Sequence, residues 1–238
     1  GQEVVKLWHK DTDLQEVDFI ILPGGFSYGD YLRSGAIAKF SPIMKEVIGF
    51  ANSGGYVMGI CNGFQTLVKM GLLPGDDDVS LTQTASLALN DSGHYENRWV
   101  TLEFNSESPC VWTKNLERIR VPVRHGEGKF VAANVELMDH WDHSGQIVVR
   151  YVDPDSTYPS SSDELLPYPI SPNASMRNIA GVCDPTGRVF GLMPHPEANH
   201  STWLGATWTR ELTASEHGEG EGLAIFRNAV DYVEKNLK

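Results

Sequence analysis

The sequence predicts an α/β fold, built as a doubly wound, mainly parallel sheet that is flanked by helices and extended by additional antiparallel strands. Two observations lead to this prediction. Between residues 17 and 71, short apolar runs alternate with amphipathic stretches, as strands and helices do in a parallel sheet. Farther along, the apolar runs have antiparallel character, and a tight turn sequence joins the last two of them.

The first strand and helix are marked by turn and cap residues. Residues 17–22 form a short apolar run that ends at the sequence Pro-Gly-Gly, which indicates a buried parallel strand leading into a loop. Ser41 and Pro42 then match a helix N-cap followed by proline at the first helical position. The apolar face of this helix is expected to hold Ile43, Val47 and Phe50.

A cysteine lies between two glycines at residues 59–63, Gly-Ile-Cys-Asn-Gly, where a strand over residues 56–58 ends and a helix begins. Glycines on both sides allow a tight strand-to-helix turn that presents a nucleophile, here Cys61. The following helix N-terminus is expected to favour the reactive thiolate of Cys61. A buried, inert cysteine is the alternative reading of this motif.

A second motif, residues 191–197, reads Gly-Leu-Met-Pro-His-Pro-Glu. A cysteine nucleophile needs a base, and His195 is suited to that role. Glu197, two residues later, can accept a hydrogen bond from the imidazole and fix its tautomer. A turn with a surface histidine is the alternative, which the Cys61 motif makes less attractive.

The remaining elements are antiparallel strands, a loop and a closing helix. Residues 179–183 and 188–193 flank the turn sequence Asp-Pro-Thr-Gly, which predicts a hairpin that leads to His195. Residues 153–174, rich in Pro and Ser, are expected to form a long loop. Further strands are expected over residues 99–104, 118–123 and 147–152, and residues 4–8 could form one more. The last helix is expected to have one apolar face, made by Leu223, Phe226, Val230 and Val233.

Composition excludes several classes of function. The 238 residues include 19 basic and 31 acidic side chains, a formal charge of −12, and no basic cluster that would bind nucleic acid. No apolar run is long enough to cross a bilayer, and the first residues do not form a signal peptide. The 3 cysteines are odd in number and widely spaced, as expected of reduced thiols in the cytoplasm.

These motifs together resemble those of the class I, triad-type glutamine amidotransferases, which have a flavodoxin-like fold. Within that family the sequence is most similar to the members that serve purine biosynthesis. The resemblance implies that residues 1–238 form a single domain of this type, without its usual N-terminal strand and helix. It spans most of the chain in six segments: residues 21–44, 58–67, 97–100, 124–130, 178–184 and 187–197.

The resemblance also assigns roles to residues. Cys61 would attack the side-chain amide of glutamine, His195 would relay protons, and Glu197 would orient His195. The oxyanion would be held by backbone N–H groups near Gly25 and of Asn62. Gln65 would contact glutamine, although a helix-surface role is its alternative. The segment His-Gly-Glu-Gly, with His125 and Glu127, would lie near the mouth of the site or serve as a structural loop, and Tyr28 and Arg33 would meet a partner or shape the pocket.

The partners implied by the resemblance are glutamine and a large synthetase subunit, with a small accessory subunit left open. ATP and Mg²⁺ are expected on the synthetase, because this chain has no G-x-x-x-x-G-K-[ST] pattern and is expected to bind no cofactor or metal itself. The cluster at residues 140–143, His-Trp-Asp-His, matches no common metal motif. The segment after Glu197 lacks the arginine that often follows it in the family, which puts peripheral contacts in doubt.

Three alternatives remain open from the sequence. The chain could be a glutaminase that serves another synthetase, or a non-catalytic regulatory subunit on the same fold. It could also be a cysteine hydrolase that acts on esters or peptides and ignores glutamine.

Overall fold

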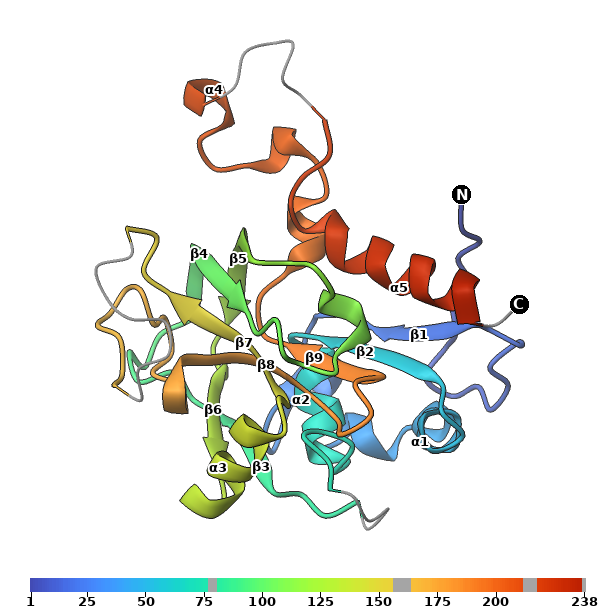
Figure 1. Cartoon of the computed structure of the whole chain (residues 1–238). Coiled ribbons are helices and arrows are strands. Elements are labelled where there is room, and N and C mark those ends of the chain that lie inside the picture. The colour runs from blue at the N-terminus through green and yellow to red at the C-terminus, as the bar shows by residue number, and fades with distance from the viewer. Residues whose placement is uncertain (77–80, 156–163, 212–217, 237–238) are drawn as a thin grey trace.

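A seven-stranded mixed sheet forms the centre of the computed structural model, which describes residues 1–76, 81–155, 164–211 and 218–236 (Figure 1). Its order is β1-β2-β9-β8-β7-β4-β5. The first three strands, β1 (Phe19–Leu22), β2 (Tyr56–Ile60) and β9 (Val189–Leu192), pair in parallel. The others pair antiparallel: β8 (Ile179–Cys183), β7 (Ile147–Val152), β4 (Glu96–Phe104) and β5 (Arg118–His125). The predicted α/β class with additional antiparallel strands is therefore confirmed. The expectation of a mainly parallel sheet was wrong, because only the β1–β2 and β2–β9 pairs of this sheet are parallel and its other four described pairs are antiparallel.

Helices cover both faces of the parallel part of the sheet. The helices α1 (Pro42–Asn52) and α2 (Asn62–Lys69) lie on one face, and α5 (Leu223–Asn236) lies on the other (Figure 1). Ser41 occupies the predicted N-cap of α1, but its hydroxyl bonds to the Tyr28 hydroxyl at 3.0 Å instead of capping the helix. Of the face predicted for α5, Val233 is buried and Phe226 packs partly buried against the core. The prediction missed Ile225 and Ala229, which are the most buried residues of this helix.

A second, two-stranded sheet lies beside α2, and the sequence did not predict it. It pairs β3 (Ala85–Ala88) with β6 (Lys129–Ala132) and is followed by α3 (Val135–His143). Aromatic rings join these elements to the core, since Phe130 lies 6.4 Å from Phe64 of α2 and 6.1 Å from Trp141 of α3. Burial of these three rings anchors α2, the helix that follows Cys61.

The predicted hairpin is present and ends three residues before His195. Strands β8 and β9 pair antiparallel, and the Asp184 carboxylate closes their turn by accepting from the Val189 N–H at 2.8 Å. The expected strand over residues 4–8 was wrong, because no described strand pairs with this segment and Val4 and Trp8 are largely exposed. Of the loop predicted over residues 153–174, residues 156–163 lie outside the described part, and the rest contains neither helix nor strand.

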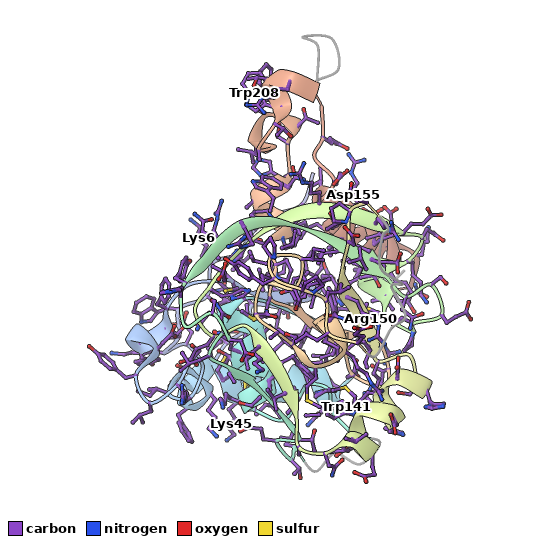
Figure 2. The ribbon with its side chains drawn as sticks, turned by 90° about the vertical axis from the view of Figure 1, so that its left-hand side faces the viewer. Lys6, Lys45, Trp141, Arg150, Asp155 and Trp208 are labelled. Atoms are coloured by element: carbon purple, nitrogen blue, oxygen red, sulfur yellow. The ribbon has the colours of Figure 1, made fainter. Side chains whose placement is uncertain are left out.

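The segment after Glu197 projects away from the sheet. It carries α4 (Trp208–Glu211), and Figure 2 shows Trp208 far from the body of the molecule. The indole of Trp203 packs on that of Trp208 with ring centroids 4.9 Å apart. Short 3-10 helices complete the structure: η1 (Ser27–Asp30), η2 (Ala38–Phe40), η3 (Val111–Thr113), η4 (Met176–Asn178), η5 (Pro196–Asn199) and η6 (Thr202–Leu204).

Candidate active site

Cys61 sits at the apex of the tight turn between β2 and α2. Its backbone has φ 51° and ψ −105°, a conformation that a residue with a side chain rarely adopts. The turn is held on both sides, since the Cys61 N–H donates to the Leu192 carbonyl at 2.8 Å and the Cys61 carbonyl accepts from the Gln65 N–H at 2.9 Å. The strained nucleophile turn predicted from the sequence is therefore present.

The two glycines of the turn are required by close packing. A Cβ at Gly59 would lie 2.7 Å from the backbone of Gly63 and Phe64, and a Cβ at Gly63 would lie 2.1 Å from the Leu22 carbonyl oxygen. Either contact is too short for a side chain. The glycines thus let α2 start directly against β1 and β2, which fixes the direction in which Cys61 points.

His195 and Glu197 form a hydrogen-bonded pair. The distance from His195 Nδ1 to Glu197 Oε1 is 2.6 Å. Because a carboxylate only accepts, Nδ1 carries the proton and Nε2 presents a lone pair. That Nε2 is buried and has no protein partner among the residues that the structure describes. The imidazole is thus oriented and keeps one free nitrogen, as a general base requires.

Cys61 and His195 meet across the backbone of Gly24, which follows β1. A Cβ at Gly24 would lie 2.7 Å from His195 Cε1 and 3.5 Å from Cys61 Cβ. The side chains of His195 and Cys61 therefore both lie next to Gly24, and close to each other. The carbonyl of Arg124, at the end of β5, accepts from the Cys61 thiol at 3.6 Å. The structure therefore brings together residues from β1, β2, β5 and the segment after β9.

Burial dominates the electrostatics of Cys61. Burial is the main cause that raises the pKa of its thiol to about 12, and the Asn62 backbone N–H offsets only part of that rise. The carboxylates of Glu197 and Asp30 contribute smaller parts of this rise. The N-terminus of α2 therefore favours the thiolate, as expected, but burial has the larger effect and leaves the pKa of the thiol raised. Cys61 is a thiol until a base removes its proton.

The loop between β1 and α1 holds the position predicted for an oxyanion donor. Gly25 has φ 147°, and four residues with side chains follow it in the left-handed region: Tyr28, Asp30, Leu32 and Arg33. Such conformations persist only where the surroundings hold them. A Cβ at Gly35 would lie 2.8 Å from the Thr66 nitrogen, which shows that this loop packs directly on α2.

Gln65 and Glu127 join α2 to the segment after β5. Gln65 is 4% exposed, so the alternative of a helix-surface residue was wrong. Its Nε2 donates to the Glu127 carbonyl at 2.6 Å. The Glu127 carboxylate accepts from the Ser34 N–H at 3.2 Å and pairs with Arg33 at 3.4 Å. Glu127 therefore lies against α2 and the loop after β1, which agrees with the placement that the resemblance implied and leaves a purely structural role open.

His125 is a second buried histidine beside the site. Its Nδ1 lies 3.1 Å from Asn90 Oδ1, which also accepts from the Gly128 N–H, so Nδ1 is the donor. Burial, and to a lesser degree nearby His195, lowers the pKa of His125 to about 4. This imidazole is neutral at pH 7, and its buried Nε2 has no partner within the described residues.

Other residues named from the sequence are placed as follows. Tyr28 donates or accepts through its hydroxyl with His9 and Ser41, and is 43% exposed. In the cluster at residues 140–143, Trp141 is buried and Asp142 pairs with Arg150 and Arg177. No three potential ligands gather around a metal position in the described ranges. No helix among those ranges is long and apolar enough to cross a bilayer.

Sequence reasoning missed three polar side chains of the site. Ser27 and Asp30 bond to the Asn62 side chain, and Asn90 fixes the tautomer of His125. Ser27 and Asp30 had a signal, since both lie within the segment of residues 21–44 that carries the resemblance. An apolar groove of about 490 Å³ also borders β1 and the loop that follows it, but neither Cys61 nor His195 lines this groove.

Comparisons with known proteins agree with this geometry. The chain matches the CobB/CobQ-like glutamine amidotransferase domain over residues 3–233. It is 41% identical over 236 residues to the phosphoribosylformylglycinamidine synthase subunit PurQ of Mycobacterium tuberculosis, covering 98% of this chain and 87% of that protein. The same subunit of Moorella thermoacetica is 42% identical over 229 residues, covering 93% and 89%.

Solved structures give the same picture. PurLQS from Thermotoga maritima matches with a TM-score of 0.67 and 34% identity, covering 94% of this chain and 83% of that chain. The glutaminase domain of Trypanosoma brucei CTPS with bound acivicin matches with a TM-score of 0.50 and 13% identity, covering 96% and 81%, which shows the fold alone.

Proposed function

The chain belongs to the CobB/CobQ-like glutamine amidotransferase domain family, and from this we propose that Cys61, His195 and Glu197 carry the glutaminase reaction of a phosphoribosylformylglycinamidine synthase. The protein is a glutamine amidotransferase of purine biosynthesis, and its relatives named PurQ are 41–44% identical to it. The observation that carries the assignment of residues is the His195–Glu197 pair beside the strained Cys61 turn.

In the first half of the reaction, His195 Nε2 takes the proton from the Cys61 thiol, and the sulfur attacks the side-chain amide carbon of glutamine. The tetrahedral intermediate collapses as the carbon–nitrogen bond breaks. The protonated His195 returns its proton to the leaving nitrogen, so ammonia departs and a glutamyl thioester remains on Cys61. The raised pKa of the thiol explains why this chemistry depends on a base.

In the second half, water attacks the thioester. His195 takes a proton from that water, the carbon–sulfur bond breaks, and the proton returns to the Cys61 sulfur as glutamate leaves. Each tetrahedral intermediate carries an oxyanion, for which we assign the backbone N–H groups near Gly25 and of Asn62. Loss of one such donor typically lowers the rate about 100- to 1,000-fold. We assign Gln65 to contact the glutamine, and His125 and Glu127 to the wall of the site.

The ammonia is used by a synthetase subunit. The 34% identical structure from Thermotoga maritima is that of an assembly, PurLQS, which supports a complex of this chain with a synthetase and a small accessory subunit. We place ATP and Mg²⁺ on the synthetase, where formylglycinamide ribonucleotide is converted to formylglycinamidine ribonucleotide. The three free cysteines fit a reducing compartment, and we place the complex in the cytoplasm.

The test separates ammonia production from its use. In the complex with the synthetase, Cys61→Ser should abolish synthesis from glutamine and leave synthesis from added ammonium salts intact. The matched control is Cys110→Ser or Cys183→Ser, at thiols buried in the core away from the site. The rate of glutamine-dependent synthesis per folded molecule should be the same in those variants as in the wild type. Equal loss of both activities in Cys61→Ser would contradict the proposal.

The same experiment addresses the alternatives. Unchanged glutamine-dependent synthesis in Cys61→Ser would indicate a regulatory subunit. Hydrolysis of ester or peptide substrates without glutamine turnover would indicate another cysteine hydrolase. If the chain produced ammonia from glutamine but only a different synthetase could use that ammonia, the chain would serve another pathway.

A further inference from the structure

The Asn62 side chain makes a complete set of hydrogen bonds at the centre of the site. Its Oδ1 accepts from the Ser27 N–H at 3.3 Å and the Ser27 hydroxyl at 2.5 Å. Its Nδ2 donates to Asp30 Oδ1 at 3.0 Å and to Gln65 Oε1 at 3.1 Å. A primary amide has two donor and two acceptor positions, and all four are occupied here. The residue is 1% exposed, so this amide is fixed in one orientation.

The loop that Asn62 holds is strained. Tyr28 has φ 56° and Asp30 has φ 54°, and Gly29 between them has φ 64°. Residues with a side chain are strained in this region, and they keep that conformation only where contacts over-determine it. Asn62 contacts this run at its start, through Ser27, and at its end, through Asp30. The same loop presents Gly25, to which the proposed function assigns an oxyanion donor.

Asn62 also belongs to the Cys61 turn. Its backbone N–H lowers the pKa of the Cys61 thiol, and its carbonyl accepts from the Thr66 hydroxyl at 2.9 Å within α2. One residue therefore connects the nucleophile, the strained loop and Gln65. Through Gln65 Nε2 the connection continues to the Glu127 carbonyl at the mouth of the site.

We propose that the Asn62 side chain is a positioning residue that clamps the Gly25–Asp30 loop onto the Cys61 turn, so that the two oxyanion donors stay at a fixed separation. This inference rests on the proposed function, since it concerns the same reaction. An aspartate of the same shape could not serve, because it has no N–H to donate to Asp30 and Gln65 and would place a second carboxylate beside Asp30.

The first test compares two reactions of Cys61 in the complex with its synthetase. Asn62→Ala should lower kcat for glutamine hydrolysis by about 100-fold, as expected when an oxyanion donor is displaced. Alkylation of Cys61 by iodoacetamide should stay near the wild-type rate, because displacement of iodide forms no oxyanion. Asn228→Ala is the matched control, since that amide on α5 donates to the carbonyls of Trp112 and Lys114 and should leave both reactions unchanged.

The second test is a rescue. Asn62→Asp should lower kcat at least as much as Asn62→Ala. Adding Asp30→Asn to Asn62→Asp should restore part of the rate, because the new amide at position 30 donates to the new carboxylate at position 62. Parallel loss of glutamine hydrolysis and alkylation in Asn62→Ala, or no recovery in the double variant, would overturn the positioning role. No glutamine hydrolysis by the wild-type complex would overturn the proposed function itself, and this inference with it.

Discussion

His195 is oriented through one nitrogen and free at the other, because its Nδ1 lies 2.6 Å from Glu197 Oε1 while its buried Nε2 has no partner among the described residues. The Glu197 carboxylate is itself 44% exposed, so the pair is only partly shielded from water. This arrangement fixes the tautomer in which Nε2 can accept a proton.

Replacement of the carboxylate should weaken that control. Glu197→Gln is expected to lower kcat for glutamine hydrolysis by about 10- to 100-fold, less than the roughly 10⁴-fold seen for a fully buried triad carboxylate. The loss arises because an amide can donate to Nδ1 and so favour the wrong tautomer. Steady-state ammonia production in the complex measures it, with the exposed Glu136→Gln in α3 as control. A kcat equal to wild type would show that His195 does not depend on Glu197.

The buried thiol predicts a steep pH dependence of labelling. Since burial raises the pKa of Cys61 to about 12, the thiolate fraction is small at neutral pH. Below its pKa that fraction grows about tenfold per pH unit. Iodoacetamide labelling of Cys61 should therefore keep rising from about pH 7 to pH 10 without a plateau, and Cys61→Ser should remove it. A plateau below about pH 8 would indicate a resting thiolate.

His125 should make the fold sensitive to acid. Its pKa is about 4 in the folded protein and about 6.5 in the unfolded chain, so between these values the unfolded state binds the extra proton. Stability from this residue is therefore complete above about pH 6.5 and is lost as the pH falls toward 4, by at most about 3 kcal/mol.

The measurement is the free energy of unfolding in urea at pH 7 and pH 4.5. His125→Gln, which has no group that titrates in this range, should show a smaller decrease than wild type. Equal decreases in both proteins would assign the acid sensitivity to other groups.

The packing of the Cys61 turn can be tested with paired glycines. Gly63→Ala places a Cβ 2.1 Å from the Leu22 carbonyl oxygen and should destabilise the protein by about 1–3 kcal/mol, as overpacking does. Gly49→Ala, on the exposed face of α1 with open space around it, should stabilise by about 0.5–1 kcal/mol. Thermal unfolding measures both, and equal effects would mean that α2 can move away from β1 freely.

The features that the sequence predicted are set by local rules. The Cys61 turn follows from two glycines two residues from the cysteine, and the β8–β9 hairpin follows from an Asp-Pro-Thr-Gly turn. In the Pro-His-Pro-Glu segment the carboxylate of Glu197 lies only two residues from the imidazole of His195, so their hydrogen bond depends little on the rest of the fold. These elements are in the structure where the sequence placed them.

The features that it missed depend on distant packing. The β3–β6 sheet joins strands about 40 residues apart, and the rotation of α5 is decided by what Ile225 and Ala229 meet. The raised pKa of Cys61 follows from burial under several elements, which outweighs the local helix N-terminus. The roles of Ser27 and Asp30 likewise appear only when the loop folds onto Asn62.

The most direct test of the account is alkylation by a glutamine-analogue diazo-ketone, followed by peptide mapping in a mass spectrometer, on the chain in complex with its synthetase. We expect one adduct, on Cys61, that excess glutamine prevents and that Cys61→Ser lacks. An adduct on another residue, an adduct that glutamine does not prevent, or no adduct at all in the complex would contradict Cys61 as the glutaminase nucleophile.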